Sequence, residues 1–352
     1  MASIKKTAIR TGLETLYFSG LHHLMRPLVG GVGVILTLHH VRPRRRGAFQ
    51  PNRILEVTPR YLDAVVSQLR RWKFDIISLD EMHERLLAKK FDRRFVCFTL
   101  DDAYVDNLEH AYPIFKKHDA PFALFVPTSF PDRRGELWWL AIEQIIAKND
   151  SIGLLMNGRE QRLECRSLGE KRELYDALYG WLRERESDDE IRRIVRDLAK
   201  RYHVDIAQIC EQQCMSWDQI GELARDSLVT VGAHTVNHPI LTKIPTAKVT
   251  AEMKMSRAVI EGAIGKAPAH FAYPFGQRYS AGQREFRMAR DLGFKTALTT
   301  RPGVIFPGHV NQMWSLPRIS LNGEYQQLRY LRVLVSGAAT ALWSGFRRVE
   351  AA

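Results

Sequence analysis

The sequence predicts an α/β fold in which a mostly parallel sheet is interleaved with helices. Short apolar runs typical of buried strands alternate with segments whose apolar residues recur at helical spacing. Several of these runs end in polar residues that can act as acids, bases or metal ligands. Because the carboxyl ends of parallel strands meet on one side of such a fold, the same pattern predicts where a functional site lies.

The predicted strands and helices alternate along most of residues 31–325, which we interpret as one α/β body. The helix at residues 58–72 has Thr58 as its N-cap and Pro59 at its first position. The predicted strands are residues 34–38, 76–77, 95–100, 122–126, 228–232, 269–273, 296–298 and 314–319. The other predicted helices are residues 78–88, 105–117, 246–262 and 281–292.

The rhythm changes at residues 131–216, which predict a mainly helical insertion in the α/β body. A helix at residues 137–147 carries Trp138 and Trp139, and a capping box at residues 187–190 opens another helix. The insertion has no convergent set of metal-ligand or catalytic residue types. We therefore do not expect it to be a separate catalytic unit. Residues 326–352 predict a C-terminal helical tail.

Residues 1–30 predict an N-terminal amphipathic helical segment. Its apolar residues recur at helical spacing opposite a basic face, and they are Leu13, Tyr17, Leu21, Leu24 and Leu28. This face either packs on the body of the protein or lies on a membrane surface. No transmembrane run and no signal-peptide core are found, so we expect a cytoplasmic location, with peripheral contact at the inner membrane face left open.

Composition and charge narrow the classes of partner. The chain has 352 residues and a formal net charge of +13, which favours acidic partners, but basic residues are interspersed with acids along most of it. No nucleic-acid-binding motif is present, so nucleic acid is not an expected partner. The densest basic cluster, residues 42–46, is either a rim that attracts an anionic substrate or a mobile loop. The four cysteines lack disulfide-like spacing, which favours a reducing compartment.

Two strand ends carry the residues that are best suited to metal binding and catalysis. Asp101 and Asp102 follow the strand at residues 95–100, and two adjacent carboxylates repel each other unless they share a cation or a proton. His234 and His238 follow a later strand at a spacing that lets both imidazoles face one way. Two histidines and one carboxylate form a metal site with open positions, so Asp102 is the predicted third ligand. Asp101 is then free to act as a base toward a water whose pKa the metal lowers.

Three segments, in this order, resemble the main motifs of the polysaccharide deacetylases, carbohydrate esterase family 4, which include the nodulation chitooligosaccharide deacetylases. They are TLDDA at residues 99–103, HTVNH at 234–238 and YPFG at 273–276, and residues 35–41 resemble the family's first strand. The likeness spans about residues 33–320. It implies a distorted (β/α) barrel with fewer than eight regular repeats. It also implies an N-acetylated glycan substrate that is hydrolysed with a divalent metal, usually zinc.

The resemblance assigns roles residue by residue. Asp101 corresponds to the general base, and Asp102, His234 and His238 correspond to the metal ligands. The backbone N–H of Phe275 corresponds to an oxyanion donor. Two aromatic pairs, Tyr273 with Phe275 and Trp138 with Trp139, either line the sugar site or pack in the core.

Three departures from the family pattern concern catalytic competence. Ala103 stands where the family usually has glycine, and Ala272 stands where an arginine often orients the base. Arg318 is our candidate replacement for that arginine, or else a structural residue. The family's late histidine, which protonates the leaving amine, has no match, and His39 is the candidate that takes its place, or else a core histidine. A catalytically impaired carbohydrate-binding or regulatory protein is therefore the alternative function.

Overall fold

The computed structural model describes residues 2–156, 159–185 and 187–347. Seven parallel strands close into a barrel, because β1 pairs with both β5 and β12. In order around the barrel they are β1 (Gly33–Leu38), β5 (Phe95–Asp101), β6 (Phe122–Val126), β9 (Val229–Ala233), β10 (His270–Ala272), β11 (Thr296–Pro302) and β12 (Leu316–Ser320). The short β4 (Asp75–Ile76) also pairs with the start of β5. The predicted distorted (β/α) barrel is confirmed.

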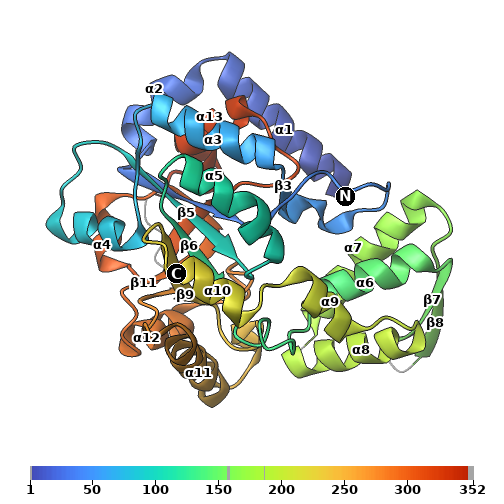
Figure 1. Cartoon of the computed structure of the whole chain (residues 1–352). Helices are drawn as coiled ribbons and strands as arrows, with labels where there is room; N and C mark the ends of the chain where they lie inside the picture. Colours follow the sequence, from blue (N-terminus) through green and yellow to red (C-terminus); the bar gives the residue numbers. More distant parts are fainter. Residues whose placement is uncertain (1, 157–158, 186, 348–352) are drawn as a thin grey trace.

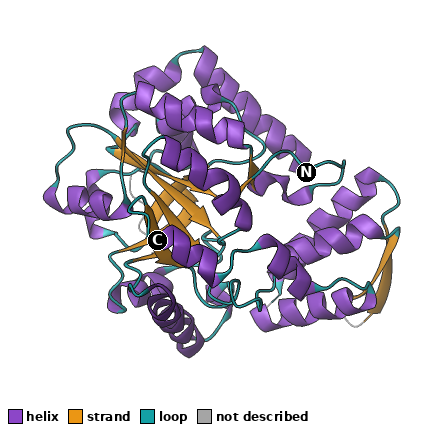
Figure 2. Ribbon diagram, viewed as in Figure 1, coloured by secondary structure: helices purple, strands orange, loops and turns teal. Residues whose placement is uncertain are grey.

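Helices surround this barrel, as Figures 1 and 2 show. They are α3 (Pro59–Arg71), α4 (Leu79–Ala88), α5 (Tyr112–Lys117), α10 (Trp217–Ala224), α11 (Thr246–Ile264) and α12 (Gln283–Asp291). The Thr58 hydroxyl accepts a hydrogen bond from the Tyr61 N–H, which makes Thr58 the N-cap of α3 as predicted. A π-helical turn at Asn107–Ala111 precedes α5. Three 3-10 turns lie at Pro51–Leu55, Leu241–Lys243 and Pro307–Asn311.

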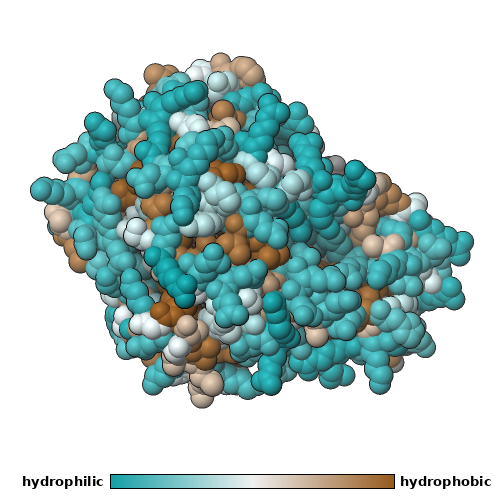
Figure 3. Space-filling model, in the orientation of Figure 1, coloured by the Kyte–Doolittle hydropathy of each residue, from teal (hydrophilic) through white to brown (hydrophobic). Residues whose placement is uncertain are grey.

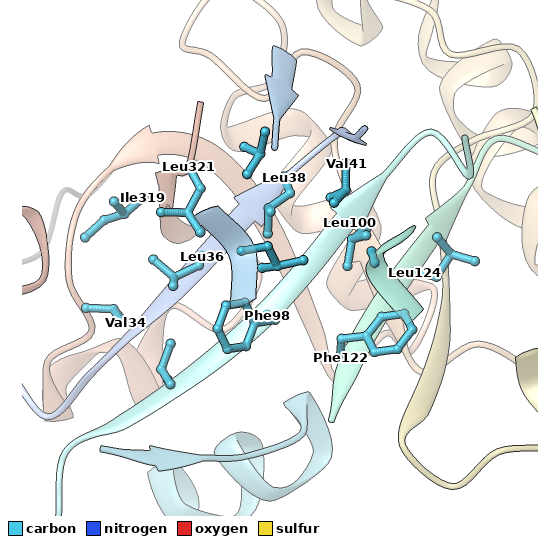
Figure 4. Close-up of a cluster of buried hydrophobic side chains, with 14 of the residues drawn as sticks. Val34, Leu36, Leu38, Val41, Phe98, Leu100, Phe122, Leu124, Ile319 and Leu321 are labelled. Atoms are coloured by element: carbon cyan, nitrogen blue, oxygen red, sulfur yellow. The ribbon is translucent and has the colours of Figure 1, made fainter. Parts of the chain in front are cut away.

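Residues along the strands alternate between two layers of the core. On β1, Val34, Leu36 and Leu38 belong to the layer between barrel and helices, which Figure 4 shows together with Phe98 of β5. Ile35, between them, packs inside the barrel instead. On β5, Cys97 likewise packs inside the barrel, so the same parity directs Thr99 and Asp101 inward at the carboxyl end. The interior is therefore apolar at its amino end and polar at its carboxyl end.

The insertion between β6 and β9 forms the lobe on the right of Figure 1. It has a hydrophobic core cluster of its own. Its elements are α6 (Trp138–Lys148), the antiparallel hairpin of β7 (Ser151–Met156) and β8 (Arg159–Glu164), α7 (Leu168–Glu184), α8 (Asp188–Arg201) and α9 (Ile206–Gln213). The hairpin was not predicted, because the residues of β8 are almost all exposed and lack the alternation of a buried strand.

The two ends of the chain pack together. The N-terminal α1 (Ala2–Phe18) and α2 (Leu21–Val29) contact α13 (Leu328–Val335) and α14 (Ala338–Trp343). Leu13 and Leu16 of α1 are buried against this pair, whereas Leu24 of α2 remains exposed. The predicted N-terminal helical segment therefore consists of two helices. Gly20, with a φ of 72°, turns the chain between the two helices.

A small parallel ribbon extends the barrel next to β1. It consists of β2 (His40–Val41) and β3 (Glu56–Val57). None of the helices in the described parts of the chain combines the length and the apolar character that crossing a lipid bilayer requires.

The interior of the barrel has no room for a side chain at Gly232 of β9. A Cβ there would lie 2.4 Å from the Phe125 ring and 3.2 Å from the His270 carbonyl oxygen. We expect Gly232→Ala to lower the free energy of unfolding by about 1–3 kcal/mol, since overpacked cores must distort. Gly262→Ala is the matched control, because nothing lies within 4 Å of a Cβ at this site in α11. It should raise stability by about 0.5–1 kcal/mol. Urea unfolding measures both, and equal effects would contradict the tight interior.

Candidate metal and catalytic site

Asp102, His234 and His238 converge at the carboxyl ends of β5 and β9. Ligand atoms of the three side chains all lie within 4.8 Å of one another. Asp102 Oδ1 is 3.6 Å from His234 Nε2 and 3.4 Å from His238 Nε2. All three residues are buried. The structure thus brings together the three residues that the sequence predicts as metal ligands.

The surroundings of the two histidines suit metal coordination. His234 Nδ1 lies 2.6 Å from the Ala272 carbonyl oxygen, so Nδ1 carries the proton and Nε2 presents its lone pair toward Asp102. Burial lowers the pKa of His234, and it lowers the pKa of His238 still further, with the His234 charge adding to the effect. Both imidazoles are therefore neutral near pH 7, which is the form that binds a metal.

Asp102 lacks the partners that a buried carboxylate needs. Its Oδ1 is buried and accepts no hydrogen bond from any residue that the structure describes. Burial, and after it the negative charge of Asp101, raises the pKa of Asp102 to about 8. A cation between Asp102 and the two histidines would satisfy this oxygen and stabilise the ionised form. Two imidazoles and one carboxylate fit a divalent metal such as zinc.

Asp101, in contrast, is neutralised by an arginine. Arg318 Nη1 donates to Asp101 Oδ1 at 2.8 Å, and Nη2 donates to Oδ2 at 2.7 Å. Two further hydrogen bonds hold the guanidinium, from Nε to the Thr299 carbonyl at 2.8 Å and from Nη1 to Thr99 Oγ1 at 3.1 Å. Burial acts to raise the pKa of Asp101, but the Arg318 charge and hydrogen bonds outweigh it and hold that pKa well below its usual range. The adjacent acids therefore differ: Asp101 has a cation, and Asp102 has none among the described residues.

The two histidines that follow β1 point to opposite sides, as period-two alternation predicts. His39 is close enough to Asp101 and Arg318 for both charges to act on it, although burial is the main cause that lowers its pKa to about 4. His40 faces away, with Nδ1 2.7 Å from Asp106 Oδ2 and its ring stacked on Tyr104. Of the two, His39 is the one that lies near Asp101.

The third motif contributes one aromatic residue to the site. The Phe275 ring lies 4.9 Å from the His238 ring, and the Phe275 N–H has no hydrogen-bond partner in the described parts of the chain. Tyr273 is buried in the outer core, where its hydroxyl donates to the Trp314 carbonyl oxygen at 2.8 Å. Of the two alternatives for Tyr273, the structure therefore shows core packing.

Backbone strain is concentrated in the three site loops. Five non-glycine residues there have positive φ, and they are Asp102, Ala103, Thr235, His238 and Phe275. Each such residue costs about 1–3 kcal/mol and persists only where surrounding contacts impose it. Ala103, with a φ of 50°, has the left-handed conformation that glycine adopts readily. The exchange of glycine for alanine at this position thus adds strain to a glycine-like backbone.

The insertion packs against the metal-ligand residues. The Trp139 ring of α6 lies 5.3 Å from the His238 ring. The ring of Phe130, in the segment between β6 and α6, lies 6.0 Å from the same histidine ring. Trp138 and Trp139 are only 1% and 5% exposed, so they anchor the insertion and are not available to stack on a sugar. The sequence suggested the anchoring role, but it did not show that this anchor touches a metal-ligand residue.

The loop that carries both histidines is clamped from two sides. Glu252 of α11 accepts hydrogen bonds from the Val236 and Asn237 N–H groups at 2.7 and 2.9 Å. Arg192 of α8 donates to the Asn237 carbonyl at 2.6 Å, and it is paired with Asp188 at 2.6 Å. Sequence reasoning missed these residues, because only a spacing of four on an amphipathic helix connects Asp188 with Arg192.

The basic cluster at residues 42–46 is partly used to tie the insertion to the barrel. Arg42 pairs with Glu56 at 2.7 Å and donates to Gln213 of α9 at 3.1 Å. Arg45 pairs with Glu56 and with Glu143 of α6 at 2.7 and 2.8 Å. These two arginines therefore have internal partners and do not form a free rim for an anionic substrate.

We expect Arg318→Met to destabilise the metal-free protein by about 3–5 kcal/mol, because it leaves Asp101 buried without its partner. The pH dependence should also change sign. The native pKa of Asp101 lies below its unfolded value, so its contribution is present above pH ~4 and is lost in acid. An unpaired buried carboxyl has a raised pKa, so in the variant stability should fall as pH rises through that pKa.

Urea unfolding between acid and neutral pH measures this effect, and Arg85→Met is the matched control. Arg85 pairs with Asp75 and Glu81 at the surface, so its loss should cost at most about 1 kcal/mol. Similar losses in the two variants would contradict the assigned role of the Arg318 pair.

Comparison with known proteins supports these assignments of fold and family. The model of the polysaccharide deacetylase family matches residues 173–297, a stretch that contains His234, His238 and Phe275 but not the acid pair. No curated protein matches the sequence.

Several solved deacetylases have a similar structure. Streptococcus pyogenes deacetylase PplD, in complex with acetate, is 18% identical with a TM-score of 0.56, covering 86% of this chain and 97% of its own. IcaB from Ammonifex degensii is 18% identical with a TM-score of 0.53, covering 87% and 96%. A de-N-acetylase from Aggregatibacter actinomycetemcomitans is 14% identical with a TM-score of 0.54, covering 86% and 99%. At such identities the likeness shows the fold, and the family match adds the relationship. Residues 173–297 therefore match the polysaccharide deacetylase family, and the chain as a whole has the (β/α) barrel fold of these solved deacetylases.

Proposed function

We propose that this protein removes N-acetyl groups from a glycan that contains amino sugars and that it uses a divalent metal, zinc in our proposal, to do so. The observation that carries the proposal is the convergence of Asp102, His234 and His238 beside an ionised Asp101. The fold and the family match support glycan deacetylation as the reaction. The donor set of two neutral imidazoles and one carboxylate favours zinc over magnesium or calcium, which prefer oxygen ligands.

Asp102, His234 and His238 would hold the metal, which when bound polarises a carbonyl group and makes a nearby water more acidic. Asp101 is placed to accept the proton of the attacking water. Its bidentate contact with Arg318 keeps the carboxylate ionised and oriented, at the expense of its basicity. A weak base passes its proton on readily. This suits a carboxylate that passes the proton of the attacking water on to the group that protonates the leaving amine.

Two further groups complete the proposed reaction. The Phe275 N–H is free to donate a hydrogen bond to the oxyanion that forms when the acetyl carbonyl is attacked. His39 lies near Asp101 and is neutral at pH 7, so it can take up the proton that Asp101 receives from the attacking water and deliver it to the departing amine. In this way residues from four strand ends, those of β1, β5, β9 and β10, act on one substrate group.

The alternative function, a catalytically impaired carbohydrate-binding protein, loses part of its support. It depended on Ala103 in place of glycine, on Ala272 in place of the usual arginine and on the missing late histidine. Arg318 occupies the space beside the base, and His39 lies next to the same carboxylate. Glycan binding without acetate release in a metal-loaded sample would select the alternative.

We expect Asp101→Asn to reduce the rate of acetate release by at least about 100-fold, since it removes the proton acceptor. Metal content should stay unchanged, because Asp101 is not among the three metal-ligand residues. Acetate release from N-acetylated chitooligosaccharides, with metal analysis of the same samples, measures both quantities. Asp92→Asn, at an exposed position before β5, is the control and should behave as the wild type. Retained activity in Asp101→Asn would rule out its role as the base.

We expect His238→Gln to lose bound metal and, with it, the increase in unfolding temperature that zinc gives the wild type. The control is His203→Gln, which changes an exposed histidine outside the site. Because the pKa of Asp102 is raised to about 8, zinc binding should release a proton below that pH and strengthen as the pH rises toward it. Calorimetry in two buffers of different ionisation enthalpy measures this release. Unchanged metal content in His238→Gln would contradict the ligand assignment.

We expect His39→Gln to lower kcat by about 10²–10⁴-fold with little change in KM, since general acid catalysis acts only on the transition state. The neighbouring His40→Gln serves as a comparison. Its loss breaks the hydrogen bond to Asp106, so it should reduce stability and not kcat of the folded enzyme. Normal turnover in His39→Gln would show that another group protonates the leaving amine.

A further inference from the structure

Exposed apolar side chains are concentrated where the two chain ends meet. Of the twelve large apolar residues that are exposed in the described parts of the chain, seven lie on α1, α2, α14 or the residues just after α14. These helices contact one another. The seven residues, which we call the apolar ridge, are Phe18, Leu21, Leu24, Leu28, Leu342, Trp343 and Phe346. Figure 3 shows a mostly hydrophilic face on which apolar atoms appear along the upper edge, where α1 and α2 meet.

A basic pocket lies next to the apolar ridge. It is formed by α2, the end of α3, the residue before β5 and the turn between α13 and α14. No carboxylate is among its lining residues, whereas five permanent cations are. The five cations are Arg26, Arg71, Lys73, Arg94 and Arg332. Together with His22 and His23, we call them the basic pocket. Trp72 and Phe74 also line it, and the Arg332 guanidinium lies 4.9 Å from the Trp72 ring and the Arg94 guanidinium 4.9 Å from the Phe74 ring.

The cations of the basic pocket lack internal counter-charges. In the described ranges, none of the five forms an ion pair, whereas Arg192 and Arg318 near the candidate metal site do. Arg94 is the most deeply placed, and it donates to the Gly30 and Val335 carbonyl oxygens while its Nε has no partner. Burial, with the charge of Arg26, lowers the pKa of Arg94 to about 10. Such a gathering of like charges is stabilised when an anion binds among them.

The short helix α2 joins the two features. Leu21, Leu24 and Leu28 recur at helical spacing on its exposed side, while His22 and Arg26 lie in the basic pocket one step around the helix. An apolar stripe with a basic flank is typical of helices that lie in the interface of an anionic membrane. Trp343 adds an aromatic side chain of the kind that is enriched at the level of lipid headgroups.

We propose that this face binds to the surface of a bilayer that contains anionic lipids. The apolar ridge enters the boundary between headgroups and acyl chains, and the basic pocket receives the phosphate of an anionic headgroup. A second copy of the chain fits less well, because symmetric contact of this face would bring the two sets of unpaired cations together. The proposal is independent of the deacetylase activity, since every residue in it lies outside the metal and catalytic site.

Docking in this way orients the barrel. Arg94 directly precedes β5, and Lys73 lies just before β4, so the basic pocket is at the amino ends of the strands. The metal-ligand residues lie at the carboxyl ends. The site therefore faces away from the bilayer, toward a glycan in the aqueous phase.

Co-sedimentation with lipid vesicles tests the proposal with the full chain. We expect the protein to bind vesicles of phosphatidylcholine mixed with phosphatidylglycerol, to bind pure phosphatidylcholine weakly, and to dissociate as salt is added. Arg26→Gln and Arg332→Gln should each weaken binding about fivefold. Leu24→Asn should weaken it by a similar factor, since an apolar side chain no longer enters the interface.

Matched controls are Arg287→Gln on α12 and Leu87→Asn on α4, which change an exposed arginine and an exposed leucine on other faces. Both should bind vesicles as the wild type does, and all variants should keep the wild-type unfolding temperature and deacetylase rate. Three outcomes would overturn the proposal: no preference for anionic vesicles, equal loss in the controls, or full competition by inorganic phosphate at millimolar concentration. Loss of a dimer in Leu24→Asn, with vesicle binding intact, would likewise assign the ridge to self-association.

Discussion

The buried pair of Arg318 and Asp101 determines how the rest of the site is organised. Two adjacent carboxylates at 1% and 2% exposure would repel each other strongly if neither had a cation. Arg318 neutralises the first with two parallel hydrogen bonds, and this leaves the second, Asp102, to face two neutral imidazoles. The pair depends on barrel closure, because β12 and β5 are joined through β1, whose Thr37 hydroxyl also donates to Asp101 Oδ2 at 3.5 Å.

Much of the site was predictable because it follows simple parity and spacing. Asp101 is in phase with the interior residues of β5, His39 is in phase with Thr37, and His234 and His238 are separated by one helical turn. The position of Tyr273 follows from the same parity. Ala272 faces the interior, so Tyr273 is directed outward to the helices, where it packs against Phe286.

Other features had no signal in the sequence. Asp102 and Thr235 have a left-handed backbone conformation that tertiary contacts impose, and the residue types at these positions do not predict it. The clamp of Glu252 and Arg192 on the histidine loop joins helices from the barrel and from the insertion, and such long-range hydrogen bonds have no local pattern. The break between α1 and α2 did have a signal in Gly20, which was masked by the regular apolar spacing on either side. The two features are connected, because the hydrogen bonds from Glu252 in the barrel and Arg192 in the insertion hold the histidine loop in its strained backbone conformation.

The separation of Asp101 and Arg318 in the sequence has a consequence for how the chain folds. Asp101 and Arg318 are separated by 217 positions, with the whole insertion between them. In the order of synthesis, Asp101 therefore precedes its arginine by most of the barrel. Until β12 is present, a buried and ionised Asp101 would lack its counter-charge, which is costly. The strand that completes the barrel is thus also the strand that allows this carboxylate to be buried in its charged form.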